Sequence, residues 1–104
     1  MVSNKIIFNL KRFWPPDAPK NRQVRLYEEI KAGRKTCEYR DDKPYWLKRL
    51  LGRMRPSKAW FVEGYPKGSL PRLEADITRI VVNEMSRKIE IYFTNIKEKV
   101  PMQT

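Results

Sequence analysis

The sequence predicts a mixed α+β domain with two principal helices packed around a small, curved β-barrel sheet. Its 104 residues suffice for one hydrophobic core but not for two. The strand and helix patterns alternate in the first half and give way to consecutive strands in the second half. We therefore expect one domain over residues 1–104 and not a doubly wound parallel fold.

The first element predicted is a strand over residues 5–10, KIIFNL, which is apolar and rich in β-branched side chains. It ends at WPPDAP, because proline cannot extend a strand ladder. A helix is predicted over residues 22–32, with Asn21 as N-cap and Gly33 just after its end. The apolar face of this helix is formed by Leu26, Tyr27 and Ile30.

A short strand, KTCEYR at residues 35–40, follows the glycine. The period of two places Cys37 and Tyr39 on one face, which we expect to be the core side. Thr36, Glu38 and Arg40 would then form a polar floor on the other face. Lys35, at the helix–strand junction, could join the same pocket. The alternative is an exposed edge strand whose ion pairs contribute only about 0–1 kcal/mol.

The second helix is expected to begin at an Asp42 cap, with Pro44 in its first turn, and to end at Gly52. Its buried stripe is Trp46, Leu47, Leu50 and Leu51.

Residues 57–68 predict a strand closed by a glycine and proline turn. Residues 73–82 then pair with residues 88–96 in a hairpin across the turn 83–86. The apolar phase changes within its first strand, which predicts a bulge near Thr78 and Arg79.

The charge balance favours a polyanion partner, because 23 Lys and Arg against 12 Asp and Glu leave a net charge of +11. Residues 1–55 hold 15 basic and 6 acidic side chains and therefore carry most of this excess. The alternative is that the charge only keeps a small domain soluble. The residues predicted to bind nucleic acid are Lys11, Arg12, Trp14, Arg34, Lys48, Arg49, Arg53, Arg55 and Tyr65. Among the aromatics, Phe13, Trp14 and Tyr65 are expected to be exposed, and Trp46 and Trp60 to be buried.

Histidine is absent from the sequence, which excludes His-activated nucleophiles and nearly all catalytic zinc arrangements. The one cysteine, Cys37, cannot form an internal disulfide and is expected to be a small buried side chain, not a nucleophile. No leader pattern or long apolar run is present. We therefore expect a protein of a reducing compartment, the cytoplasm or nucleus, with no cofactor, metal or membrane partner.

The stretch EEIKAGRKTCEYR resembles the G-x-K-T-x-E-x-R signature of the ASCH domain, a family with a PUA-like barrel associated with RNA. Gly33, Lys35, Thr36, Glu38 and Arg40 carry the match. A helix before the motif, an Ala-Trp-Phe-Val strand and the later ADITRIVV extend it loosely over most of the chain. The resemblance implies that the motif lines a cleft where RNA or a nucleotide binds, with Lys35, Thr36, Glu38 and Arg40 as ligand contacts.

Some ASCH-type proteins are amidohydrolases acting on acylated cytidine, which makes a hydrolase the alternative function. This chain has Glu38 where those enzymes have a threonine nucleophile, and Thr36 stands two positions away. Glu74 or Asp76 could supply their later carboxylate, or could lie on the outer face of the hairpin. A metal-independent ribonuclease using Lys35 and Glu38 as an acid–base pair is a second enzymatic possibility. A module that docks an acidic protein partner is a third reading.

Overall fold

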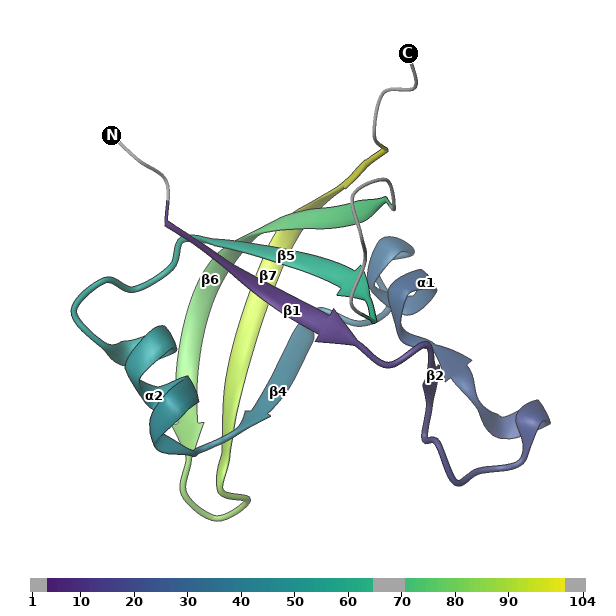
Figure 1. Cartoon of the computed structure of the whole chain (residues 1–104), viewed down its shortest axis with the longest axis horizontal. Helices are drawn as coiled ribbons and strands as arrows, with labels where there is room; N and C mark the ends of the chain where they lie inside the picture. Colours follow the sequence, from purple (N-terminus) through teal and green to yellow (C-terminus); the bar gives the residue numbers. More distant parts are fainter. Residues whose placement is uncertain (1–3, 65–70, 101–104) are drawn as a thin grey trace.

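The computed structural model describes residues 4–64 and 71–100 and confirms a mixed α+β fold built on a strongly curled sheet (Figure 1). The elements in chain order are β1 (Lys5–Leu10), β2 (Phe13–Trp14), the 3-10 turn η1 (Lys20–Arg22), β3 (Val24–Arg25), α1 (Leu26–Lys31), β4 (Cys37–Asp41), α2 (Pro44–Leu51), β5 (Lys58–Glu63), β6 (Arg72–Asn83) and β7 (Lys88–Lys99). Within these residues, no helix is long and apolar enough to cross a membrane.

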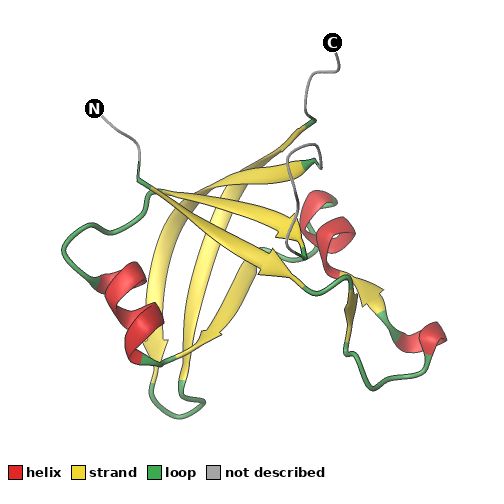
Figure 2. Ribbon diagram, viewed as in Figure 1, coloured by secondary structure: helices red, strands yellow, loops and turns green. Residues whose placement is uncertain are grey.

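Five strands form the main sheet in the order β1-β5-β6-β7-β4, which curls into a half-barrel (Figure 2). The first pair, β1 and β5, runs parallel, and every other neighbouring pair in this sheet is antiparallel. The hairpin of β6 and β7 is confirmed, and its register shifts between Ile77 and Arg79, as predicted. A second shift, between Glu74 and Asp76, was not predicted. Both irregularities bend the two long strands and allow the sheet to curl.

The core fills the concave side of the sheet. Alternate residues of β1, namely Ile6, Phe8 and Leu10, point into it, as the period of two requires. The other buried members of the cluster are Tyr27, Ile30, Leu50, Ala59, Phe61, Leu73, Ala75, Ile89, Ile91 and Phe93. Both α-helices therefore contribute to one core with all the central strands.

The first helix is shorter than predicted, and the Asn21 cap is wrong. Asn21 lies in η1, whereas α1 begins at Leu26 after an extended Arg25. Residues Val24–Arg25 pair with Phe13–Trp14 in a separate two-stranded sheet, which keeps the chain extended up to Arg25. The predicted role of Gly33 is confirmed, because it follows the C-cap with a φ of +80° that favours glycine.

The second helix ends at Leu51 before Gly52, as predicted, but its N-cap is Lys43 and not Asp42. Lys43 makes no side-chain capping bond, and Pro44 begins the helix with a preset φ. The expected apolar stripe is confirmed: Leu50 is fully buried, and Trp46, Leu47 and Leu51 pack against the core while partly exposed.

The predicted alternation of the motif strand is confirmed, but the face that was assigned to the core is wrong. Glu38 pairs with Ile91 and Arg40 with Ile89 across β4 and β7, so these polar side chains share the face of buried isoleucines. Tyr39 is 49% exposed on the opposite face. Sequence reasoning assigned the more apolar residues to the core, but here ion pairing compensates for burial of the carboxylate.

Candidate functional site

The charged residues Lys35, Glu38 and Arg40 of the motif line a hollow of about 670 Å³, which we call the motif pocket. It lies between the C-terminal end of β1, the strand β4 and the first turn of α2. Its lining residues are Asn9, Leu10, Lys11, Trp14, Leu26, Lys35, Glu38, Tyr39, Arg40, Asp41, Trp46 and Lys88. Four cations against two carboxylates leave this lining with a net charge of +2.

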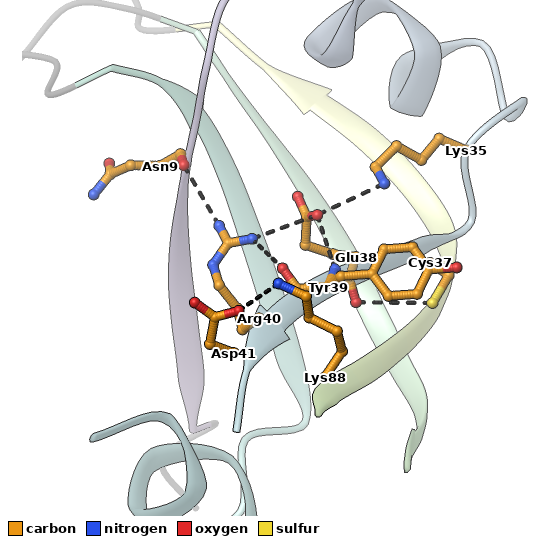
Figure 3. A network of polar contacts seen from close by, with 8 residues as sticks. All are labelled: Asn9, Lys35, Cys37, Glu38, Tyr39, Arg40, Asp41 and Lys88. Carbon is orange, nitrogen blue, oxygen red and sulfur yellow. Dashed lines mark hydrogen bonds and ion pairs between the residues drawn. The ribbon is translucent and has the colours of Figure 1, made fainter. Parts of the chain in front are cut away.

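Glu38 is the buried centre of the motif pocket, with 6% of its surface exposed. One of its oxygens, Oε1, lies 3.6 Å from Lys35 Nζ and 3.4 Å from Arg40 Nη1. The same oxygen accepts a hydrogen bond of 2.9 Å from the Tyr39 backbone N–H. Figure 3 shows Lys35 and Arg40 approaching this oxygen from opposite sides. The predicted convergence of the three charged groups is confirmed.

The second carboxylate oxygen of Glu38, Oε2, is open. Within residues 4–64 and 71–100, no group donates a hydrogen bond to it, whereas the Tyr39 N–H donates to Oε1. Because no buried side-chain oxygen of these residues lacks a partner, Oε2 must touch solvent. A ligand entering the motif pocket would therefore meet a free acceptor beside two donors.

Arg40 also bridges the open side of the half-barrel, between the edge strands β1 and β4, which we call the seam. Its Nη1 donates to the Tyr39 carbonyl at 2.7 Å, and its Nη2 donates across the seam to the Asn9 carbonyl at 3.4 Å (Figure 3). The guanidinium carbon lies 4.7 Å from the ring centre of Phe8 and 5.3 Å from that of Trp46. Stacking and hydrogen bonding together fix the orientation of this guanidinium.

Aromatic side chains form part of the wall. Trp14 is 46% exposed, as predicted, and the Lys11 ammonium lies 5.7 Å from its ring centre. Trp46 is only partly buried and leaves part of its ring facing the pocket. At the rim, Lys88 donates to Asp41, and this hydrogen bond keeps the pKa of the Asp41 carboxyl below its usual value.

Cys37 is the first residue of β4 and does not line the motif pocket. It is partly buried, and burial raises the pKa of its thiol. Its Sγ contacts the Glu38 carbonyl at 3.7 Å. A thiol with a raised pKa is a weak nucleophile at neutral pH.

Several residues predicted to contact ligand or nucleic acid lie outside the motif pocket. Thr36 precedes β4 and is exposed, while its carbonyl accepts from the Phe93 N–H. Arg34 pairs with Glu29 at 2.6 Å. The Arg12 guanidinium carbon lies 5.6 Å from the ring centre of Phe13. Tyr65, which was predicted to be exposed, lies outside the described residues.

The basic residues of α2 form a separate depression, which we call the α2 groove. It is lined by Asn4, Lys5, Ile6, Tyr45, Lys48, Arg49, Arg53, Met54 and Pro56. Three of the predicted nucleic-acid contacts, Lys48, Arg49 and Arg53, lie here, and the exposed Arg55 follows them in the chain. Of the basic residues predicted to bind nucleic acid, Lys11 thus lines the motif pocket, whereas Arg12, Arg34 and Arg55 line neither depression.

Trp60 was expected in the core, which is wrong. It alternates with the buried Ala59 and Phe61 and therefore points to the outer face of the sheet. Glu74 and Asp76 lie on this same outer face, in β6, which is separated from the β4 strand of Glu38 by β7. They line a different depression, which shares no residue with the motif pocket. This position matches the outer-face reading of the two carboxylates.

Sequence reasoning missed Asn9, Leu10 and Leu26 in the motif pocket, together with Asp41 and Lys88. Asn9 and Leu10 reach it because β1 forms the edge facing β4, a pairing order that no local pattern encodes. The proximity of Asp41 and Lys88 follows from the register of β4 and β7. Within the described ranges, no cluster of three Cys, Asp or Glu side chains could hold a metal ion.

Comparisons with protein-family models, with curated proteins and with solved structures find no match to this chain.

Proposed function

We propose that this chain is a PUA-like domain of ASCH type that binds RNA or a nucleotide in the motif pocket. The observation that supports the proposal best is the pairing of a buried carboxylate with two cations at the base of a solvent-reachable hollow. Burying a carboxylate beside partly buried cations is weakly stabilising at best, so such a cluster suggests a ligand-binding role.

The donors and acceptors of the motif pocket suit the edge of a nucleobase. Glu38 Oε2 would accept from an exocyclic amine, while Lys35 and Arg40 would donate to a base or phosphate oxygen. Trp14, with nearly half of its surface exposed, offers a face on which the base could stack. Such stacking contributes about 1–3 kcal/mol per base.

A longer RNA would also use the cations of the α2 groove. Lys48, Arg49 and Arg53 are exposed and make no ion pair with any described residue. Contacts of this kind release counterions from the RNA. The logarithm of the binding constant should therefore fall linearly with the logarithm of the salt concentration.

The pocket is tested by titrating nucleoside monophosphates while tryptophan fluorescence is recorded. A Trp60→Phe background removes the tryptophan on the outer face, so the signal comes from Trp14 and Trp46. We expect saturable quenching by at least one nucleotide, and a loss of affinity of at least tenfold in Glu38→Gln. Glu63→Gln, a carboxylate outside the motif pocket, is the matched control. No quenching by any nucleotide, or equal affinities in the two variants, would contradict the proposal.

A hydrolase is the second candidate, favoured by one contact. Lys35 Nζ lies 3.6 Å from Glu38 Oε1, so the two groups could exchange protons with a substrate bound beside them in the motif pocket. Thr36 is exposed and does not line the pocket, which disfavours it as a nucleophile. Acylated cytidine and RNA should be incubated with the parent and with Lys35→Ala; equal background turnover would exclude this candidate.

A further inference from the structure

The outer face of the sheet carries a third depression with an excess of positive charge, which we call the outer groove. It has a volume of about 660 Å³ and is lined by Lys5, Lys58, Trp60, Glu74, Ala75, Asp76, Asn95, Lys97 and Lys99. Three of its charges are already paired, because Lys58 pairs with Asp76 and Glu74 pairs with Arg72 outside the groove lining. No carboxylate of a described residue lies within ion-pair distance of Lys5, Lys97 or Lys99.

Trp60 organises this groove. The Lys5 ammonium lies 3.8 Å from the centre of its ring, and the Arg72 guanidinium carbon lies 4.0 Å from it. These are short cation–π distances, and they hold two long, flexible side chains, from β1 and β6, against the same ring. The tryptophan therefore presents cations on the surface, instead of filling the core as its size would suggest.

The outer groove joins the α2 groove through one residue. Lys5 lines both depressions, because it lies at the N-terminal end of β1 where the outer face meets the segment after α2. The α2 groove has four cationic lining residues and no carboxylate. No residue lining the motif pocket lines either groove, and the pocket lies at the opposite end of β1, at Asn9 and Leu10.

We propose that the outer groove and the α2 groove form one continuous track for the phosphodiester backbone of a nucleic-acid strand. This inference rests on the proposed function, and it adds a surface that the motif does not contain. Lys5 would be the shared contact, with Lys97 and Lys99 on one side and Lys48 and Arg49 on the other.

The lining of the outer groove favours nucleic acid over an acidic protein. Among its described residues only Trp60 and Ala75 are apolar, and cations already occupy the tryptophan ring. Protein interfaces require a desolvated apolar centre with aromatic anchors. Interfaces with nucleic acid are more polar and strongly positive, as this surface is.

The test measures the salt dependence of binding to a labelled single-stranded 12-nucleotide RNA by fluorescence anisotropy. Three double variants each remove two positive charges: Lys97→Gln with Lys99→Gln in the outer groove, Lys48→Gln with Arg49→Gln in the α2 groove, and Arg79→Gln with Arg87→Gln as a control outside both. Each lost phosphate contact lowers the slope of log K against log salt by about 0.7 for a single strand. We expect the slope to fall by about 1.4 in each groove variant and to stay unchanged in the control.

Equal slopes in all three double variants, or no RNA binding at low salt, would overturn the track. Binding of polyglutamate with the same affinity and the same sensitivity to the groove variants would assign the surface to an acidic protein instead. Mononucleotide quenching, measured in the same variants, separates the two proposals: it depends on the motif pocket and should be unaffected by the groove substitutions. Altered slopes without mononucleotide binding would support the track and reject the pocket.

Discussion

Replacing Arg40 by alanine should destabilise the fold more than removal of any exposed arginine. The substitution removes the ion pair with Glu38, two hydrogen bonds to backbone carbonyls and contacts with two aromatic rings. Breaking a buried ion pair from one side costs about 3–5 kcal/mol. Because Lys35 still contacts the same Glu38 oxygen, we expect the lower end, about 3 kcal/mol.

The measurement is urea unfolding followed by circular dichroism, with thermal unfolding as a second readout. For a domain of this size, a loss of about 3 kcal/mol lowers Tm by at least about 12 °C. Arg79→Ala is the matched control, because its guanidinium also lies beside an aromatic ring, 5.1 Å from Tyr92, but is exposed and has no ion pair with a described residue. That variant should lose less than about 1 kcal/mol.

The double variant Arg40→Ala with Glu38→Gln isolates the ion pair. If the pair is responsible, the two effects will not add, and their coupling will be about 1–3 kcal/mol. Arg40→Lys should fall between alanine and the parent, since one ammonium cannot replace a fork that reaches both carbonyls. A loss in Arg40→Ala no larger than in Arg79→Ala would refute this reasoning.

Four further predictions concern other parts of the fold. Gly33→Ala should cost about 1–2 kcal/mol in urea unfolding from backbone strain alone, because φ is +80° and the space around the new methyl is open; Gly33→Asn should cost less. Hydrogen bonds from Lys31 and Tyr27 lower the pKa of Glu98. The stability that this carboxylate contributes is therefore present above about pH 4.3 and is lost as the pH falls below that value. In Glu98→Gln, the midpoint of urea unfolding should therefore decrease less steeply as the pH is lowered through this range. Burial raises the pKa of Tyr27, so its contribution is present below about pH 10 and lost as the pH rises further, and Tyr27→Phe should abolish this alkaline loss. Cys37 should react with iodoacetamide more slowly in the folded protein than in urea, because burial raises the pKa of its thiol.

The strands of the main sheet and the end of the first helix could be predicted because their signals are local, whereas the short pair β2 and β3 was not predicted. The alternation of β1, the hairpin of β6 and β7, and the positive φ of Gly33 each follow from a few adjacent residues. The parallel pairing of Lys5 with Lys58 has no such signal, because it joins segments far apart in the sequence.

The errors at Glu38 and Trp60 have a common physical cause. Hydrophobicity assigns a carboxylate to the surface and a large aromatic to the core, unless cations accompany them. Lys35 and Arg40 compensate for burial of Glu38, and Lys5 and Arg72 cover the ring of Trp60 outside the core. The cations beside Glu38 are close to it in the sequence, but their side-chain directions are not encoded by a local pattern. The cations on the Trp60 ring come from other strands, β1 and β6.

The seam has a consequence for self-association. β1 and β4 are the two edges of the sheet, and an edge strand presents free backbone groups that can recruit a strand from another molecule. At the seam, the Arg40 side chain donates hydrogen bonds to the carbonyls of Asn9 and Tyr39. These carbonyls are therefore less accessible to a strand of another molecule. Loss of that guanidinium should therefore also produce oligomers whose proportion increases with protein concentration.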